Sequence, residues 1–303
     1  MDANVKARTR GLGGTDAAGI LGMSPWSSPL NVYLETIGEA PPFEGNDSTH
    51  WGNVLEAPIC EEWARRTGQK IRRHNKTLVH PEHDFLIGHI DRRILNVRAQ
   101  LEAKTAGIYT ADHWGEEGTD EVPAYYAPQA QHYMGIANLD YTDFAVLIGG
   151  NDFRMYRVER DDEFIREMHE RMTDFWFDHV VPRVPPDPQS FDEAKLVFRP
   201  KEGEIEASPE VCALVEQYQR AKADAEAAGK QADAARLEIM RLIEGQQKVK
   251  LGKRTLVSYG ETQRKAISVT ELRQQHPDIA KSLEKVSTSR TLRLYPKALE
   301  VSA

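Results

Sequence analysis

Apolar residues along the first 180 positions change their spacing several times, and each change marks a predicted helix or strand. Spacings of three and four residues indicate helices near 15–22, 29–37 and 51–67, from Pro128 to about 138, and over about 161–180. Shorter apolar runs indicate a strand-rich stretch from about 70 to 106 and strands over Thr142–Ile148 and Phe153–Val158, with a turn-type sequence between the last two. This order of elements predicts an α/β core.

A proline-rich segment separates this core from the rest of the chain. The run Pro182-Arg183-Val184-Pro185-Pro186-Asp187-Pro188 contains four prolines, and proline interrupts both helices and strands. We therefore expect two parts, a core over residues 1–185 and a C-terminal region over residues 186–303.

The C-terminal region is predicted to be a helical or α+β appendage. A long helical pattern with apolar stripes runs from Pro209 to Glu244 and is interrupted by Gly229. Strands are expected at about 248–259 and 290–295, and a helix at 269–284. The appendage could clamp DNA, bind a partner or cover the core, and its basic residues slightly favour the first role. These are Lys248, Lys250, Lys253, Arg254, Arg264 and Lys265.

Length and composition restrict the class of protein. A chain of 303 residues can bury a sizeable core in one large domain, or in one domain with an appendage. The sequence has no run of 18 apolar residues to span a membrane, and Met1–Lys6 lacks the apolar core of a secretion signal. The two cysteines, Cys60 and Cys212, fit a reduced cytoplasm and exclude a protein-borne four-cysteine iron–sulfur cluster.

The net charge of −8 is unusual for a DNA-binding protein, because phosphate contacts use Lys and Arg. The charge is unevenly distributed. Residues 65–76 contain six basic and no acidic side chains, whereas residues 112–121 contain five acidic side chains and no Lys or Arg. A basic lining within a negative molecule suits a ring or groove that holds DNA, and a solvated helix end explains the basic run equally well. The acidic run is predicted to be a loop.

Three charged residues of the strand-rich stretch could form a catalytic site. Glu102 and Lys104 are two positions apart, so on a strand their side chains share one face, and a hairpin can bring Asp91 to the same face. Two converging carboxylates bind a hard divalent cation such as Mg²⁺, and a lysine beside it can polarise the attacking water. These groups suit phosphodiester hydrolysis, and a surface hairpin with a salt bridge is the simpler alternative.

Two predicted helices carry polar residues that could join this site. Glu56 lies beside the apolar stripe of the helix over 51–67 and could reach the carboxylates from the side. Gln131 lies beside the buried stripe of the helix that begins at Pro128, where it could hold a water or a phosphate. Either residue could instead be an ordinary surface residue.

A glycine-rich loop near the N-terminus is a candidate phosphate site. The loop leads to Thr15 or Asp16 as the predicted helix N-cap, and Arg8 and Arg10 stand just upstream. The N–H groups of a helix start attract phosphate, although glycine-rich caps often bind no ligand.

Together these motifs resemble the YqaJ-type viral recombinase nucleases, which include the alkaline exonuclease of phage lambda and belong to the PD-(D/E)XK superfamily. The resemblance covers about residues 8–180. It rests on six blocks in family order: Arg-x-x-Gly-x-Gly-Gly-Thr-Asp-Ala-Ala from Arg8, Gly-Met-Ser-Pro-Trp from Gly22, Gly-Asn-x-Leu-Glu from Gly52, Gly-His-Ile-Asp from Gly88, Glu-Ala-Lys from Glu102 and Pro-Gln-Ala-Gln-His-Tyr from Pro128. The residue before Asp91 is Ile90 instead of the superfamily's proline, which is not a ligand.

The resemblance implies a restriction-endonuclease-like core with a mixed central sheet flanked by helices, and a metal site within it. Asp91 and Glu102 would bind the metal, with the Ala103 carbonyl as a third ligand, and Glu56 would complete the site. Lys104 would act as general base or orient the attacking water.

The resemblance also implies roles outside the metal ligands. Gln131 would be the glutamine that follows the core strands. Arg8, with Arg10 as a near competitor, would hold the terminal 5′-phosphate upstream of Thr15.

The implied function is Mg²⁺-dependent hydrolysis of DNA, with Mn²⁺ as a substitute. One strand of a double-stranded DNA end would be digested from 5′ to 3′, leaving a 3′ overhang for a single-strand annealing protein. The enzyme would be a homotrimeric ring of phage or prophage origin in the bacterial cytoplasm. Two alternatives remain: a restriction-type or RecB-like DNA endonuclease, which would cut closed circles, and a non-catalytic DNA-end-binding recombination factor.

Overall fold

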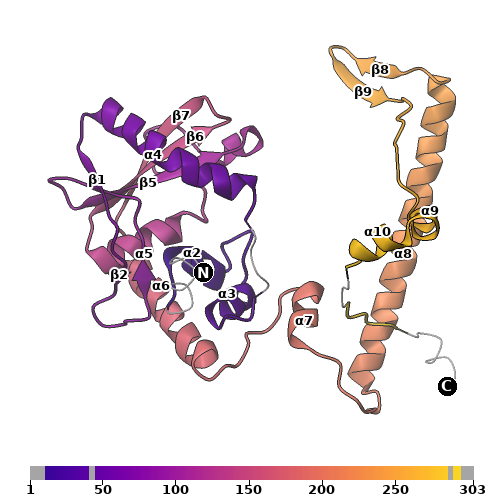
Figure 1. Ribbon diagram of the computed structural model, residues 1–303, viewed down its shortest axis with the longest axis horizontal. Coiled ribbons are helices and arrows are strands. Elements are labelled where there is room, and N and C mark those ends of the chain that lie inside the picture. The colour runs from indigo at the N-terminus through magenta and orange to yellow at the C-terminus, as the bar shows by residue number, and fades with distance from the viewer. Residues whose placement is uncertain (1–10, 41–44, 286–288, 295–303) are drawn as a thin grey trace. The chain divides into compact units, whose positions relative to one another are not determined.

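A computed structural model describes residues 11–40, 45–285 and 289–294 (Figure 1). The chain divides into two units, residues 1–198 and 199–303. The proline-rich segment at 182–188 therefore falls within the first unit, as does α7 (Phe191–Val197), a short helix that we did not predict.

A five-stranded mixed sheet forms the centre of the first unit, in the order β1-β4-β5-β6-β7. Its strands are β1 (Ile71–Arg73), β4 (Arg92–Ile94), β5 (Ala99–Ala106), β6 (Tyr141–Ile148) and β7 (Asp152–Glu159). Strands β5 and β6 are parallel, and the other neighbours are antiparallel. A parallel pair needs a crossover connection, and here the connection contains η1 (Ile108–His113), the acidic run and α5 (Ala127–Ala137).

Helices cover both faces of this sheet because apolar side chains on β5 and β6 alternate between the faces. On one face, α4 (Asp47–Thr67) packs Trp63 against Leu101. On the other face, α5 packs Met134 against Phe144 (Figure 1). The predicted α/β core with a mixed central sheet flanked by helices is confirmed.

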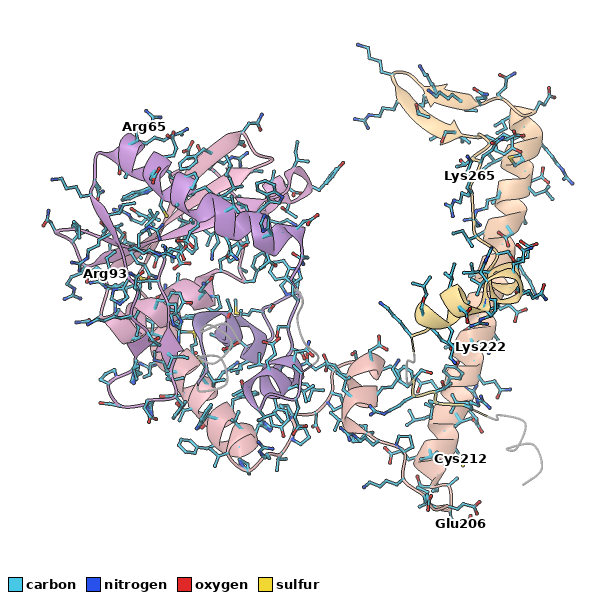
Figure 2. The ribbon with its side chains drawn as sticks, viewed as in Figure 1. Arg65, Arg93, Glu206, Cys212, Lys222 and Lys265 are labelled. Atoms are coloured by element: carbon cyan, nitrogen blue, oxygen red, sulfur yellow. The ribbon has the colours of Figure 1, made fainter. Side chains whose placement is uncertain are left out.

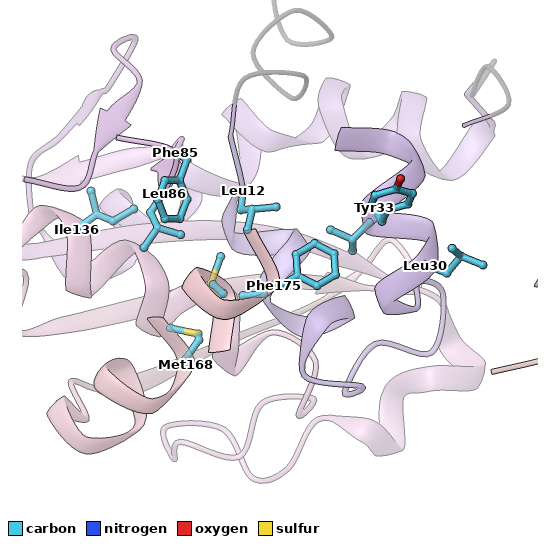
Figure 3. Packing of buried hydrophobic residues seen from close by; sticks show 11 residues of the cluster. Leu12, Leu30, Tyr33, Phe85, Leu86, Ile136, Met168 and Phe175 are labelled. Atoms are coloured by element: carbon cyan, nitrogen blue, oxygen red, sulfur yellow. The ribbon is translucent and has the colours of Figure 1, made fainter. Parts of the chain in front are cut away.

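A third apolar cluster holds the N-terminal loop beside the small β2–β3 sheet. This sheet pairs β2 (Leu78–Val79) with β3 (Ile87–Gly88). Leu12 forms a parallel bridge with Leu86 and packs in one cluster with Phe85, Met168 and Phe175 (Figure 3). The cluster also joins helices α2 (Gly14–Ile20), α3 (Pro29–Thr36) and α6 (Asp162–Phe175). The glycine-rich loop is thus held next to the chain segment that leads to Asp91.

The N-cap of α2 differs from the prediction. Gly13 is the N-cap, and the prediction of Thr15 or Asp16 at that position is wrong. Asp16 instead lies at the third helical position, where its carboxylate accepts a hydrogen bond of 2.6 Å from the Gly13 N–H. An acidic side chain in the first turn satisfies a free N–H and interacts favourably with the helix dipole.

The second unit contains one long helix and a hairpin. Helix α8 (Pro209–Ile243) runs for 35 residues and continues through Gly229. Strands β8 (Lys248–Leu251) and β9 (Arg254–Ser258) form the predicted hairpin, so the helical or α+β character of the region is confirmed.

Two predictions in the second unit are wrong. The helix expected at 269–284 is split into α9 (Val269–Gln275) and α10 (Pro277–Ser282), because Pro277 lacks an N–H and disfavours helical geometry at His276. The strand expected at 290–295 is not formed over the described residues 290–294. None of the helices in the described part of the chain is long and apolar enough to cross a membrane.

Candidate active site

The β4–β5 hairpin brings the Asp91 and Glu102 carboxylates together. Arg92 pairs with Leu101 in the antiparallel register, so Asp91, just before β4, lies across from Glu102. The backbone N–H of Ala103 donates a hydrogen bond of 2.9 Å to Asp91 Oδ2. The two acidic groups therefore meet at one end of the hairpin.

Lys104 lies on the same face of β5 as Glu102, the face covered by α5. Its Nζ donates hydrogen bonds to Glu102 Oε2 (3.2 Å) and to Gln129 Oε1 (3.0 Å). The ring of Tyr126 lies 4.8 Å from the same nitrogen. The ammonium group is thus held between one carboxylate, one amide oxygen and one aromatic ring.

Burial dominates the electrostatics of this cluster. The side chain of Glu102 is 1% exposed, and burial, followed by the nearby Asp91 charge, raises its pKa to about 8. Burial also raises the pKa of Asp91. For Lys104, burial opposes the charged form, but the Glu102 and Asp91 carboxylates outweigh it and raise the pKa. The site is therefore short of positive charge around its two carboxylates.

One atom in the cluster fits a bound cation. Glu102 Oε1 is buried and has no hydrogen-bond partner among the described residues. A buried acceptor without a partner is costly, and a divalent cation between Glu102 and Asp91 would satisfy it with the carboxylate oxygens that Mg²⁺ prefers. Across the described residues, no group of three or more His, Cys, Asp or Glu side chains is placed to hold a metal ion. The protein would thus supply two carboxylates at the centre of the site.

Glu56 approaches the cluster through Arg92. Its Oε1 accepts an ion-pair hydrogen bond of 2.6 Å from Arg92 Nη1, which also donates to the Asp91 carbonyl at 2.7 Å. Arg92 is 9% exposed, so this pair is well shielded from water. In this arrangement Glu56 neutralises the arginine next to Asp91.

Gln131 is not brought to the cluster. Its amide donates to the Glu159 carbonyl at 2.8 Å and accepts from the Asp161 N–H at 2.9 Å. These contacts join α5 to the segment between β7 and α6. The glutamine that touches Lys104 is Gln129, two positions earlier.

Other predicted residues lie away from the cluster or outside the described residues. Arg8 and Arg10 lie outside them. Thr15 lies in the first turn of α2. In the basic run, Arg65 and Arg66 both pair with Glu62 at 2.7 Å, so part of that charge is balanced locally.

Sequence reasoning missed Gln129, Tyr133 and Arg92. Gln129 and Tyr133 are four residues apart and share a helix face, and their side chains are hydrogen bonded at 3.4 Å. This spacing was visible in the sequence, but the apolar stripe drew attention to Gln131. Arg92 follows Asp91 directly, and only the fold shows that it pairs with Glu56, 36 residues earlier.

Comparison with known proteins agrees with this site and fold. Residues 4–140 match the model of the YqaJ-like viral recombinase domain. The chain is 38% identical over 177 residues to the uncharacterized protein YqaJ of Bacillus subtilis (strain 168), covering 57% of this chain and 54% of that protein. The chain thus spans about half the length of the curated relative that it matches. Residues 4–140 are a YqaJ-like viral recombinase domain, as the sequence motifs indicated.

Two solved structures are also similar to this chain. The alkaline exonuclease LHK-Exo from Laribacter hongkongensis has a TM-score of 0.46 at 15% identity, covering 57% of this chain and 89% of that one. A phage related exonuclease from Haemophilus somnus 129PT has a TM-score of 0.43 at 17% identity, covering 55% of this chain and 91% of that one.

Proposed function

We propose that this chain is a nuclease that hydrolyses DNA phosphodiester bonds with a divalent cation, Mg²⁺ or Mn²⁺, bound at Asp91 and Glu102. The observation that carries this proposal is the convergence of two buried carboxylates and Lys104, with one carboxylate oxygen unpartnered. Membership of a viral recombinase domain family supports DNA as the substrate.

The proposed roles follow from the contacts of each group. Asp91 and Glu102 would hold the cation, with the Ala103 carbonyl as a third ligand and Glu56 completing the site from α4. When bound, the cation supplies an acidified water and offsets the charge that develops on the phosphate. Lys104 is held by two acceptors, and this supports the role of orienting the water over that of general base. Gln129 would position Lys104.

The finer activity that we propose is resection of linear duplex ends from 5′ to 3′. The product would be a 3′ overhang for a single-strand annealing protein, and the enzyme would act as a homo-oligomer, with a trimeric ring as the family expectation. These features come from the family resemblance. A restriction-type endonuclease would use the same site and differ in substrate, and a non-catalytic DNA-end-binding factor would use the fold without the chemistry.

The test is incubation of the purified protein with end-labelled linear DNA and with closed circular DNA, with and without Mg²⁺. We expect Mg²⁺-dependent shortening of the linear DNA and no cleavage of the circle. Asp91→Asn should lose this activity by about 10²-fold or more, whereas Glu82→Gln, an exposed carboxylate elsewhere, should retain it. Cleavage of the circle would favour the endonuclease, and DNA binding without cleavage would favour the non-catalytic factor.

A second test addresses the glycine-rich loop. We propose that Arg8, with Arg10 as the alternative, and Thr15 bind the terminal 5′-phosphate. A charge-assisted hydrogen bond contributes about 1.5–3 kcal/mol, which corresponds to roughly a ten- to hundredfold faster rate on a 5′-phosphate than on a 5′-hydroxyl end. Arg8→Ala should remove this preference and leave basal cleavage intact. Loss of the preference in Arg10→Ala alone would assign the role to Arg10, and equal rates on both ends would refute it.

A further inference from the structure

The second unit leaves almost all of its apolar side chains in contact with solvent. Among the described residues of 199–303, Ile243 is the one buried hydrophobic residue. Large apolar residues on α8 are 41–83% exposed at the positions considered next. Burial of apolar area is what offsets the entropy lost on folding, so this unit needs a partner surface. The inference below does not depend on the nuclease activity.

The exposed apolar residues of α8 follow a strict seven-residue repeat. Starting at Val211, apolar residues recur at alternating intervals of three and four through Leu242, without exception. The bulky members lie at the two ends of the helix and are Val211, Leu214, Tyr218, Ile239 and Leu242. The central members are Ala221, Ala225, Ala228, Ala232 and Ala235. All ten are exposed, and a repeat of this kind over four or more heptads is typical of a coiled coil.

The identity of the bulky residues indicates the number and direction of the strands. With Val211 at position a, Ile239 also falls at a, and Leu214 and Leu242 fall at d. A β-branched residue at a with leucine at d favours two parallel strands. The alanines between them allow the two helices to approach closely and are strong helix formers.

The charges beside this seam agree with a parallel pair. One flank, at position e, carries Lys222 and Arg236, and the other flank, at position g, carries Asp224 and Glu238. In a parallel pair of identical helices the e flank of one faces the g flank of the other, so basic meets acidic. An antiparallel pair would place like charges together. The exposed contacts of Arg236 with Asp233 and of Glu238 with Arg241 stay within the helix and contribute little.

We propose that α8 forms a parallel, two-stranded coiled coil with α8 of a second copy of this chain. The seam consists of the ten apolar residues of the repeat, and the e and g flanks select a parallel copy. Figure 2 shows the side chains along α8, with Cys212 and Lys222 labelled. This contact is additional to any association of the nuclease domains. It gives a pairing of chains through the second unit, whereas the family resemblance implies a ring of three.

Site-directed cross-linking in the full chain tests the seam and its direction. Cys60 is buried, and Cys212 is changed to serine in every variant. Leu214→Cys places a thiol at position d, and Glu216→Cys places one at the outward position f. A short bis-maleimide should give about tenfold more covalent dimer with Leu214→Cys, because identical d residues face each other in a parallel pair. In an antiparallel pair, residue 214 would lie about 40 Å from its copy. Equal yields from the two variants would overturn the proposal.

Sedimentation of the full chain tests the stoichiometry. Ile239→Asp puts a charge into the seam, and Ala223→Asp puts the same charge on the outward face. We expect the wild-type and Ala223→Asp particles to contain twice as many chains as the Ile239→Asp particle, since a buried unpaired charge weakens the pairing by about a hundredfold. Equal numbers of chains in the wild type and Ile239→Asp would overturn the proposal. A threefold difference would overturn the two-stranded arrangement, as would dissociation by Ala223→Asp.

Discussion

At the scale of single residues, the first unit holds one carboxylate where the free fold gains least from it. Glu102 is buried, its pKa is raised by burial, and one of its oxygens has no hydrogen-bond partner among the described residues. Sites that are built for a ligand commonly cost stability when the ligand is removed. Activity and stability should therefore separate at this position.

Changing Glu102 to glutamine should abolish cleavage without weakening the fold. The amide keeps the shape and can still accept from Lys104, but it removes a carboxylate from the proposed cation site. We expect a loss of activity of about 10²-fold or more. In EDTA, the urea midpoint should be equal to or above that of the wild type, because the cost of burying a carboxylate is gone. A protein that unfolds at lower urea would show that Glu102 is held mainly for structure.

The two glutamines of α5 should have different phenotypes. Gln129→Ala removes an acceptor from Lys104, so we expect about tenfold slower cleavage with little change in stability. Gln131→Ala removes two buried hydrogen bonds to backbone groups and should lower the free energy of unfolding by roughly 1–3 kcal/mol. Cleavage rates and urea unfolding of both variants check this. The reverse pattern would restore Gln131 to the site.

At the scale of elements, the approach of α2 and β3 to α5 depends on glycine. A Cβ built on Gly14 would lie 2.7 Å from a ring carbon of Tyr133, and one on Gly88 would lie 2.8 Å from the same ring. Tyr133 is hydrogen bonded to Gln129, which holds Lys104. Close packing between these elements therefore extends into the candidate active site.

Gly14→Ala should destabilise the first unit by about 1–3 kcal/mol, because the ring of Tyr133 has to move to admit the methyl group. Gly52→Ala is the matched control. Gly52 lies inside α4, and an added Cβ would find its nearest neighbour 3.9 Å away. That change should stabilise the protein by about 0.5–1 kcal/mol through reduced entropy of the unfolded chain. Thermal unfolding of both variants measures the difference, and equal midpoints would show that Tyr133 yields without cost.

Periodicity predicted the elements whose apolar residues face one side. Helices α3, α4 and α5 and strands β6 and β7 were all expected from spacing, within a few residues of their observed ends. Helix α7 was missed because its seven residues have no buried side chain, so they carry no periodic signal. The split at Pro277 was missed although proline marks it.

The site was predictable only where residues are close in sequence. Glu102 and Lys104 share a strand, so their common face follows from a period of two. The pairing of Glu56 with Arg92 joins residues 36 apart, and their approach depends on how α4 lies on the sheet. Local sequence contains no information on that packing angle.

At the scale of the whole molecule, a histidine pair links the elements around the first apolar cluster. His132 Nε2 lies 2.8 Å from the Ile87 carbonyl, and His132 Nδ1 lies 3.1 Å from His169 Nε2. Because a carbonyl only accepts, Nε2 of His132 carries the proton, and His169 Nε2 then donates to Nδ1. This chain of hydrogen bonds joins β3, α5 and α6 and requires both rings to be neutral.

The first unit should lose stability in mild acid through these two rings. Burial lowers the pKa of His132 to about 4, and burial with the nearby His132 lowers that of His169 to about 3. His80, His83 and Arg160 add positive charge around the pair. In the unfolded chain a histidine titrates near 6.5, so between about pH 6.5 and 4 the unfolded chain binds more protons. The free energy of unfolding is therefore full above about pH 6.5 and falls as the pH is lowered towards 4.

Replacing His132 by asparagine isolates this effect. At about 1.4 kcal/mol per pKa unit, the wild type should lose on the order of 2–3 kcal/mol from this one ring between pH 7 and 4.5. His132→Asn cannot titrate, so its urea midpoint should change less with pH, even if the variant is less stable at pH 7. His113→Asn, which removes an exposed histidine, should leave the pH dependence as in the wild type. Parallel pH profiles for the wild type and His132→Asn would show that the buried pair is not the source of the acid sensitivity.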